Sequence, residues 1–316
     1  YLSDSFKVKV LDVNLVSDHI GRSVNFEFCD IRNYDDVRKG VRDVEVVINT
    51  AIVQIPLINE MERLGYEVNV LGTQNLCEAA EKADSVRGML LAGSWHVFGE
   101  RGFRGVVDEA FGFRPDKIED RARLYTLSKI AQETVVRLFD EMSRKIYGTI
   151  RMGTVLGEAM AEETAANIFI SKGLIGEPIT PFRHSMHRPM LYVDVTDVCR
   201  AFEAYAKKIL NNEVSKEAGS LAHVVNLVWP KPITVIELAN IVRDSIMNCS
   251  LGRISPEIKI IDTGQPALYE PDDKETLRVD IGKAKDFLGM QELSSPEKAI
   301  ERIVKGRIYK STDAVV

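Results

Sequence analysis

The sequence predicts an α/β protein built on a doubly wound parallel sheet, with a smaller second domain. Through the first half of the chain, short β-branched segments alternate with helical patterns, which is typical of a parallel sheet with helices on both faces. After residue 157 this rhythm gives way to a stretch rich in glycine and proline. We therefore predict a larger domain over residues 1–157 and a smaller one over 158–316, some segments of which return to the large sheet.

In the first half, segments rich in β-branched and other apolar residues predict strands at residues 7–12, 25–30, 44–51, 89–94 and 147–152. Between the second and third strands, residues 33–40 predict a short helix that a glycine closes. A helical pattern over residues 60–83 is interrupted by nothing stronger than Gly65 and Gly72. A further long helix is expected to open at Tyr125 and to continue to residue 143.

In the second half, strands are predicted at 188–194, 221–228 and 257–261, and helices at 165–172, 197–210, 236–247 and 280–289. Thr234 caps the third of these helices and Gly289 stops the fourth.

Composition excludes several classes of protein. The chain has 316 residues, 45% of them hydrophobic and 28% charged, as expected for a globular protein with a sizeable core. Its net charge of -6 gives no electrostatic footprint for nucleic acid, and no apolar run is long enough to predict a transmembrane helix or a membrane partner. The histidines and cysteines lack metal-ligand spacing, so we expect no metal site and a reducing cytoplasm for the scattered thiols: Cys29, Cys77, Cys199 and Cys249.

Tyr125 and Lys129 stand four residues apart and share one face of the predicted helix. A free tyrosine has a pKa of about 10 and is a poor base at neutral pH. A nearby ammonium group favours the phenolate, so that the tyrosine can exchange a proton with a sugar or alcohol hydroxyl. The spacing alone fits a helix start with an exposed tyrosine and lysine equally well, so the surrounding motifs decide its meaning.

Acidic residues end the first two predicted strands. In a dinucleotide-binding fold, a carboxylate at the position of Asp12 accepts hydrogen bonds from the adenosine ribose hydroxyls. No arginine or lysine follows it before Arg22, so NAD is favoured over NADP, whose 2′-phosphate the carboxylate would repel. Asp30 and Ile31 end the next strand, where a carboxylate can meet the adenine amino group and an apolar side chain can cover the ring. The alternative for Asp12 is a solvated acid at a strand end.

The glycine-rich phosphate loop G-x-x-G-x-x-G and the strand before it do not occur in this sequence. Residues 1–4 look like the end of the helix that follows such a loop, so we expect that the sequence has lost its natural beginning. The alternative is a protein that never had the loop and binds no dinucleotide.

Ser94 ends the strand over residues 89–94, and the carboxyl ends of parallel strands line the ligand crevice of such folds. Its hydroxyl is placed to hydrogen-bond the substrate oxygen that Tyr125 protonates or deprotonates. Taken alone, a serine here is more often part of a turn. His96 is expected to be structural rather than catalytic, although it stands close enough to contact a substrate.

An ordered series of motifs runs through the chain: Asp12, Asp30-Ile31-Arg32, Asn69-Val70-Leu71-Gly72-Thr73, Ser94-x-x-Val97-Phe98-Gly99, Tyr125-x-x-x-Lys129, Ile150-Arg151 and Arg188-Pro189-x-x-Tyr192-Val193. The series resembles the extended short-chain dehydrogenases/reductases and, within them, the NAD-dependent nucleotide-sugar epimerases and dehydratases. The resemblance implies a Rossmann-type fold, with NAD bound by residues 1–157. It also implies that the partner is a nucleoside-diphosphate sugar or a related small molecule, bound mainly by residues 158–316.

The resemblance gives Tyr125 the role of acid and base. Lys129 holds the nicotinamide ribose and lowers the tyrosine pKa, and Ser94 shares the substrate hydroxyl. In such enzymes NAD oxidises a sugar carbinol to a ketone and returns the hydride to either face, or the ketone permits an elimination.

The resemblance also implies binding roles. Asn69 matches an asparagine near the nicotinamide side of the cofactor, and Thr50 and Ala51 match small residues that let the backbone approach the dinucleotide. Arg188 matches an arginine that contacts the diphosphate of the substrate, a task suited to a guanidinium fork.

Several positions depart from the family pattern. Trp95 and His96 stand where the 4,6-dehydratases carry Asp-Glu, which argues against a dehydratase, and the decarboxylases tend to keep a glutamate at the position of His96. Compared with the UDP-galactose 4-epimerases, Gln54 replaces a lysine, and Thr154 replaces an asparagine of the substrate site. A second diphosphate-binding arginine is expected at Glu270, and Arg278 is out of register. The substrate therefore need not be a standard UDP-hexose.

These features favour an isomerase, an NAD-dependent 4-epimerase of a nucleoside-diphosphate sugar. The alternative is an oxidoreductase that acts on a hydroxyl or ketone of a non-nucleotide substrate, such as a steroid-like or lactone molecule. A third class, an NAD-binding protein without catalysis, has no need for Ser94, Tyr125 and Lys129 together. The family also leads us to expect a homodimer through the helices of residues 60–83 and 125–143, packed as a four-helix bundle.

Overall fold

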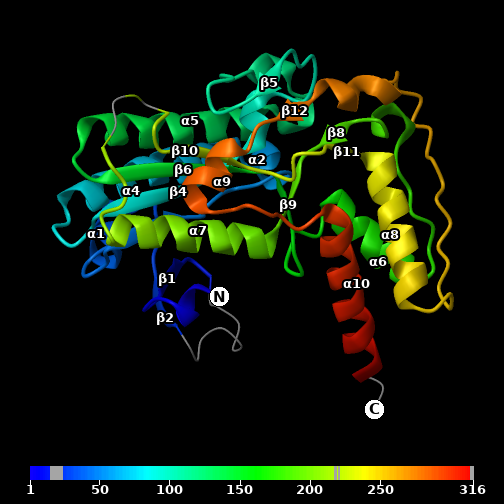
Figure 1. Ribbon diagram of the computed structural model, residues 1–316, viewed down its shortest axis with the longest axis horizontal. Helices are drawn as coiled ribbons and strands as arrows, with labels where there is room; N and C mark the ends of the chain where they lie inside the picture. The colour runs from blue at the N-terminus through cyan, green and yellow to red at the C-terminus, as the bar shows by residue number, and fades with distance from the viewer. Residues whose placement is uncertain (15–23, 217–218, 220, 314–316) are drawn as a thin grey trace.

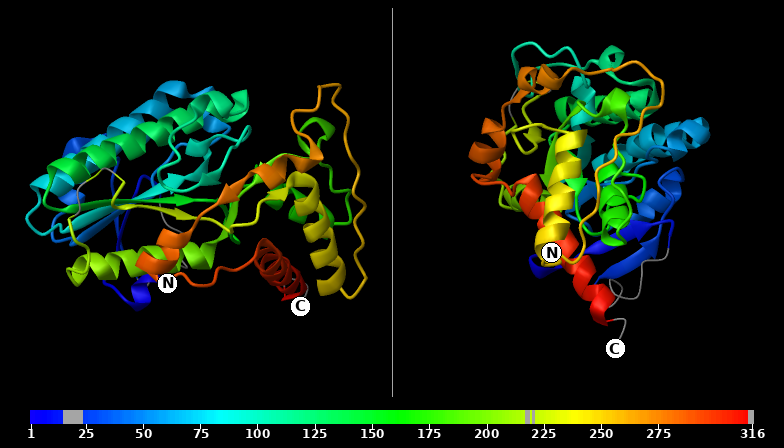
Figure 2. Two further views of the ribbon diagram at one scale, coloured as in Figure 1. Left: turned by 45° about the horizontal axis from the view of Figure 1, so that its top comes forward. Right: turned by 90° about the vertical axis from the view of Figure 1, so that its right-hand side faces the viewer.

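Figure 1 shows the computed structural model of the chain, which describes residues 1–14, 24–216, 219 and 221–313. Its centre is a four-stranded sheet in the order β10-β6-β4-β3, in which neighbouring strands run parallel. The strands cover Val224–Leu227 (β10), Ile146–Met152 (β6), Gly88–Ser94 (β4) and Val46–Asn49 (β3). In Figure 2, helices α4 (Gly72–Lys82) and α5 (Asp120–Met142) cover one face of this sheet and α7 (Val195–Leu210) covers the other. The predicted doubly wound parallel sheet is confirmed.

The N-terminal strands form a separate pair. Strand β1 (Lys9–Asp12) runs parallel to β2 (Asn25–Phe28) in a two-stranded sheet. Helix α1 (Tyr34–Gly40) follows, and the Asn33 side chain caps it by accepting a hydrogen bond from the Asp35 backbone amide. This bond is the reason why asparagine is favoured at the start of helices. Arg22, which entered the choice between NAD and NADP, lies outside the described residues.

The helical pattern over residues 60–83 is not one helix. It divides into α2 (Leu57–Glu60), α3 (Glu62–Tyr66), a π-helical turn (Glu67–Leu71) and α4. Met61 leaves the helical conformation with φ -129° and ψ 63°, so the prediction of an unbroken helix is wrong at this residue. The π-helical turn contains Asn69, and such turns occur frequently at functional sites.

The start of the helix that carries Tyr125 also differs from the prediction. Helix α5 begins at Asp120, directly after Glu119, so Tyr125 stands in its second turn and the prediction that it opens the helix is wrong. Glu119 makes no side-chain capping hydrogen bond. The residue before the helix is therefore not one of the usual capping residues Ser, Thr, Asp or Asn, and the sequence does not mark where α5 begins.

After β6 the chain leaves the central sheet at Gly153, where a Cβ atom would lie 2.7 Å from the backbone of Tyr192. Only glycine permits this close approach. Strand β7 (Thr154–Leu156) then pairs in parallel with β9 (Tyr192–Asp194), and β8 (Pro189–Met190) pairs antiparallel with β11 (Ile233–Thr234). Helix α7 and strand β10 return to the central sheet.

Helices α6 (Ala165–Leu174), α8 (Val235–Cys249) and α10 (Pro296–Asp313) pack together on the right of Figure 1. The sequence did not lead us to predict α10. None of the helices in the described part of the chain has the length and apolar character needed to cross a bilayer.

The remaining elements are short. The strand predicted at 257–261 is wrong, because this segment makes only isolated bridges, from Ile258 to Ile179 and from Ile261 to Phe182. Helix α9 (Gly282–Leu288) ends at Gly289 in the left-handed conformation, as a glycine stop does. Strand β5 (Val106–Val107) pairs with β12 (Arg278–Val279). The 3-10 turns cover Leu2–Asp4, Trp95–Phe98, Pro115–Lys117, Arg183–Ser185 and Pro271–Thr276.

A buried ion pair joins the central sheet to α5. Arg151 on β6 donates two hydrogen bonds to the Glu133 carboxylate, at 2.9 and 2.6 Å, and each of the two side chains is only 1% exposed. The Arg151 guanidinium also lies over the rings of Phe98 and Phe113. The charged pair is thus fully buried between β6 and α5. Arg151 stands opposite Gly93 of β4, the residue before Ser94.

Candidate active site

Three side chains that the sequence singled out meet at the carboxyl end of β4. Ser94 is the last residue of this strand, and Tyr125 on α5 lies near enough for the Ser94 hydroxyl to lower the pKa of its phenol. Lys129 stands one turn further along α5, with its Nζ 5.9 Å from the centre of the Tyr125 ring. The structure therefore brings Ser94, Tyr125 and Lys129 together at this end of the strand.

The protonation states of the pair differ from the sequence-based expectation. The sequence predicts that a Lys129 ammonium lowers the pKa of Tyr125. Burial instead raises the pKa of Tyr125 to about 12, against the hydrogen bond with Ser94, which lowers it. Burial also lowers the pKa of Lys129 to about 7, because the charged amine loses its hydration. In this structure burial therefore opposes the charged form of both groups.

His96 lies against this site. Its Nδ1 is 3.2 Å from the Ser94 Oγ, and its ring meets the Tyr125 ring edge-on at 5.8 Å between centroids. On the other side of the ring, Nε2 is 3.6 Å from the fully buried Oε1 of Glu100. Burial, with the nearby charges of Arg121 and Arg188, lowers the pKa of His96 to about 3. The imidazole is therefore neutral.

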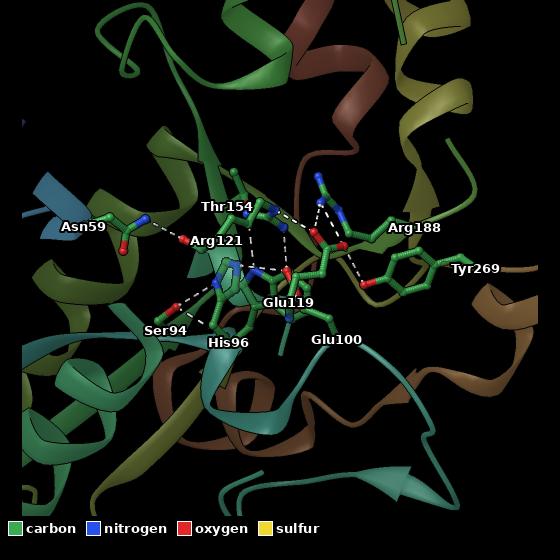
Figure 3. A network of polar contacts seen from close by, with 10 residues as sticks. Asn59, Ser94, His96, Glu100, Glu119, Arg121, Thr154, Arg188 and Tyr269 are labelled. Atoms are coloured by element: carbon green, nitrogen blue, oxygen red, sulfur yellow. Dashed lines mark hydrogen bonds and ion pairs between the residues drawn. The ribbon is translucent and has the colours of Figure 1, made fainter. Parts of the chain in front are cut away.

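A network of charges continues from Glu100 to Arg188 (Figure 3). Arg121 donates 2.8 Å hydrogen bonds to Glu100 and to Glu119, and Arg188 donates to both oxygens of Glu119 at 3.1 Å. The Tyr269 hydroxyl donates to the same carboxylate at 2.7 Å. Burial raises the pKa of Glu119, but Arg188 and Arg121 outweigh it and bring the value to about 2. Arg188, assigned from the sequence to a substrate diphosphate, is thus paired with a carboxylate of its own chain.

On the cofactor side, Asn69 fixes the loop that follows β3. Its Oδ1 accepts a hydrogen bond from the Val53 amide at 2.7 Å, and its Nδ2 donates to the Val53 carbonyl at 3.1 Å and to Ser128 Oγ at 3.0 Å. Thr50 and Ala51 lie in the loop held in this way, directly after β3. Asn69 therefore shapes the backbone at the place where the sequence predicts that the dinucleotide approaches.

The residues predicted for the adenosine end occupy the ends of β1 and β2. Asp12 is exposed, and one of its oxygens accepts a hydrogen bond from the Asn14 amide at 2.8 Å. Asp30 accepts hydrogen bonds from the Arg32 side chain at 2.9 and 3.0 Å, and this contact lowers its pKa despite partial burial. Ile31 packs on Gly72, where a Cβ atom would lie 2.5 Å from the isoleucine side chain.

These residues fit a dinucleotide with adenosine and nicotinamide ribose groups. Lys129 Nζ donates to the Ala92 carbonyl at 2.8 Å, and this is its one recorded hydrogen bond among the described residues. An ammonium has three donors, so others are available for ribose hydroxyls. The carboxylate of Asp12 can accept from the hydroxyls of the second ribose. An adenine contact at Asp30 would have to compete with Arg32.

Sequence reasoning missed Glu100, Glu119, Arg121 and Tyr269. Glu119 and Arg121 belong to a charged run just before Tyr125, which was a usable signal. Tyr269 is 150 positions from its partner Glu119, and no pattern in the sequence pairs residues over that distance.

Comparison with known proteins shows to which family the chain is related. The sequence model of the NAD dependent epimerase/dehydratase family matches residues 3–217. A Methanocaldococcus jannaschii protein named "Putative UDP-glucose 4-epimerase" is 31% identical over 210 residues, which are 63% of this chain and 65% of that protein. This chain thus spans slightly less than two thirds of that relative.

Solved structures share the fold. UDP-glucose 4-epimerase of Thermus thermophilus, in complex with NAD, gives a TM-score of 0.75 at 21% identity over 97% of this chain and 93% of that one. MoeE5, in complex with UDP-glucuronic acid and NAD, gives 0.73 at 20% identity over 98% and 93%. The matched span of the family model contains Ser94, Tyr125, Lys129 and Arg188, and the chain belongs to the NAD dependent epimerase/dehydratase family.

Proposed function

We propose that the protein is an NAD-dependent epimerase of a nucleoside-diphosphate sugar, of the 4-epimerase type. The convergence of Ser94, Tyr125 and Lys129 at one strand end carries this proposal. The name of the M. jannaschii relative and the UDP-glucuronic acid and NAD in the MoeE5 structure support the substrate class and the cofactor. When bound, NAD supplies reversible hydride transfer, and the side chains of the protein handle the proton.

The sugar hydroxyl must lose its proton as its carbon is oxidised and regain it when the carbon is reduced. Tyr125 accepts this proton as the phenolate and returns it as the phenol, the role of a positioned acid and base. Ser94 orients the substrate oxygen through a hydrogen bond. Lys129 holds the ribose hydroxyls of the cofactor and, when protonated, stabilises the phenolate.

The neighbours of Ser94 favour epimerisation over elimination. A dehydratase needs an additional acid and base beside the keto sugar. The Trp95 indole N–H instead donates to the Thr154 hydroxyl at 3.4 Å, and an indole exchanges no proton at neutral pH. His96 is a neutral imidazole that faces Ser94. These positions therefore supply no acid–base pair for the loss of water.

One observation favours a second candidate, an NAD-dependent dehydrogenase or reductase of a non-nucleotide hydroxyl or ketone. Glu119 already accepts hydrogen bonds from the Arg188 guanidinium, so a substrate diphosphate would have to displace the Glu119 carboxylate. Incubation with NAD and nucleotide sugars separates the two functions: an epimerase isomerises the sugar with no net NADH, whereas a dehydrogenase of a non-nucleotide alcohol leaves nucleotide sugars unchanged and forms one NADH per turnover only with its own alcohol. A thermal-shift screen of nucleoside diphosphates and nucleotide sugars with NAD present would select the substrates, since a ligand of the folded state raises its stability.

Arg188→Ala is expected to weaken the binding of UDP about tenfold or more, the effect of losing a charge-assisted hydrogen bond, while NAD affinity is unchanged. Glu119→Gln is expected to strengthen UDP binding, because it removes the competing carboxylate. Isothermal titration with UDP measures both effects. Arg183→Ala is the matched control, since that side chain is 62% exposed. Equal UDP affinity in the wild type and Arg188→Ala would instead indicate a substrate without a diphosphate.

We also propose a homodimer through α3, the π-helical turn and α5. These elements expose large apolar side chains, namely Met61, Tyr66, Leu71, Leu127, Leu138 and Met142. Exposed apolar surface of this kind marks an interface, and two copies of these helices would form a four-helix bundle.

Leu138→Glu is expected to convert the dimer to a monomer, because the new charge would be buried in the bundle. Sedimentation velocity measures the change. Ile175→Glu is the control, since Ile175 is also exposed but lies at the end of α6. A wild-type protein that sediments as a monomer at micromolar concentration would contradict the proposed dimer.

Two further assignments are proposals. Residues 1–157 would hold the cofactor and residues 158–316 mainly the substrate, with α7 and β10 as segments of the second part that return to the sheet. A cytoplasmic location is supported by free thiols at the four cysteines.

A further inference from the structure

We propose that a cationic cavity in the loop that contains β5 (Figure 1) is a second ligand site, which binds a nucleoside diphosphate. The cavity has a volume of about 440 Å³ and is lined by Gly102, Arg104, Phe111, Arg114 and Lys117. Three of these residues carry cationic side chains and none is acidic. Its volume lies within the range of about 300–1,000 Å³ that is typical of sites for small molecules.

The guanidinium of Arg114 is fixed before any ligand binds. It lies 5.6 and 5.5 Å from the centres of the Phe103 and Phe111 rings, and Phe103 is buried. Nη2 donates to the carbonyls of Arg101 at 3.2 Å and of Gly102 at 2.9 Å. A guanidinium has five N–H donors, and within the described residues only Nη2 has a recorded acceptor. The donors on Nε and Nη1 are therefore available to an anion.

The fold places Lys117 on the same side of the loop as Arg114. Arg114 stands directly before the 3-10 turn Pro115–Lys117, and side chains three residues apart are eclipsed in such a turn. The Arg114 amide donates to the Val97 carbonyl at 2.9 Å, and the Lys117 carbonyl accepts from the Glu100 amide at 3.0 Å. The backbone that carries both charges is thus hydrogen-bonded to the segment that follows β4.

The cavity carries an excess of positive charge. Lys117 Nζ lies 3.1 Å from a carboxylate oxygen of Asp116, but this carboxylate is 68% exposed, so water screens the pair. Arg104 is exposed, and neither Arg104 nor Arg114 forms a recorded ion pair in the part of the chain that the structure describes. An anion with two or more negative charges would balance these side chains.

A diphosphate fits this set of donors. Guanidinium groups hydrogen-bond the oxygens of phosphates, and an ammonium adds a point charge. A single phosphate would leave most of the cavity empty, whereas the base of a nucleotide can also cover the half-buried ring of Phe111. The cavity therefore takes a nucleoside diphosphate, with its phosphates at Arg104, Arg114 and Lys117.

Isothermal titration with GDP and with inorganic pyrophosphate tests the site. NAD is present at saturation, and the protein carries Arg188→Ala, which weakens the diphosphate site proposed for the substrate. GDP is used in place of ADP because ADP is part of NAD. We expect GDP to bind more tightly than pyrophosphate, because only GDP has a base that can cover Phe111.

A further substitution of Arg104→Ala or Lys117→Ala is expected to weaken GDP binding about tenfold, the effect of losing a charge-assisted hydrogen bond. Both side chains reach solvent, so these variants should fold, whereas Arg114 is left intact because it packs on two rings. Arg38→Ala is the matched control, since this side chain on α1 is 52% exposed, and it should leave the affinity for GDP unchanged.

The absence of binding by both GDP and pyrophosphate at millimolar concentration would overturn the proposed site. So would an equal affinity for GDP in the Arg104→Ala, Lys117→Ala and Arg38→Ala variants. If GDP binds no more tightly than pyrophosphate, the assignment to a nucleoside diphosphate is wrong. The titrations contain no sugar substrate, so a failed epimerase assay would refute the proposed function and leave this result intact.

Discussion

Tyr125→Phe is expected to lower kcat for the epimerisation about 10²–10⁴-fold, the range that a positioned acid or base contributes. The substitution removes the phenol hydroxyl and keeps the ring that meets His96 edge-on at 5.8 Å. The site then binds the sugar but has no group to take its proton. Steady-state kinetics with the nucleotide sugar identified by the thermal-shift screen measures the loss.

NAD affinity and thermal stability report whether the variant is otherwise intact. We expect both to be close to those of the wild type, because one lost hydrogen bond costs about 1 kcal/mol. Tyr309→Phe is the control, since this tyrosine is 69% exposed and lies on α10, and it should keep full activity. Near wild-type kcat in Tyr125→Phe would show that another group transfers the proton.

Arg151→Met is expected to destabilise the folded protein by about 3 kcal/mol, the lower end of the range for breaking a buried pair, because the Glu133 carboxylate keeps only Arg137, at 3.6 Å, as a charged partner. The side chains of both residues are 1% exposed, so water cannot solvate the remaining charge. Arg151 also donates to the Glu109 carbonyl at 2.9 Å, and this bond is lost as well. Urea unfolding followed by circular dichroism measures the free energy of unfolding.

Two variants test the cause of that loss. Arg151→Met combined with Glu133→Leu removes both charges and should recover most of the stability, since apolar replacements of a buried pair are often neutral. Arg38→Met breaks an exposed pair with Asp35 and should change stability by no more than about 1 kcal/mol. If Arg151→Met costs no more than Arg38→Met, the buried pair does not stabilise the fold.

The sequence predicted the parts of the fold that repeat a simple pattern. The strands at 89–94 and 147–152 consist largely of apolar and small residues, and they are buried neighbours in the central sheet. The segment at 257–261 has three isoleucines in a strand-like pattern but makes only isolated bridges, because such a pattern does not specify a partner strand. Helix α10 was missed although proline stands at its first position, a known signal of a helix start.

The site was predictable to the extent that its chemistry is local. Tyr125 and Lys129 share a helix face, and their spacing alone indicates it. The pKa values are not local, since they depend on burial, which raises the Tyr125 pKa in this structure although the spacing predicts a lower one. Likewise, the engagement of Arg188 by Glu119 depends on the early start of α5, which no capping residue marks. Sequence motifs thus located the reacting groups, whereas their charge states required the packed structure.

Under the proposed function and the proposed dimer, helix α5 has three tasks on its surface. Tyr125, Lys129 and Glu133 face the sheet, while Leu127 and Leu138 face outward and are exposed. A map of mutational tolerance along this helix would therefore depend on the selection that is applied. Selection for folding would constrain the inward position 133, selection for turnover would add 125 and 129, and only selection for assembly would constrain the outward positions. The set of positions that tolerate no substitution would thus differ among the three selections. Comparing the three sets would separate the proposed catalytic, structural and oligomeric roles of the helix without a ligand-bound structure.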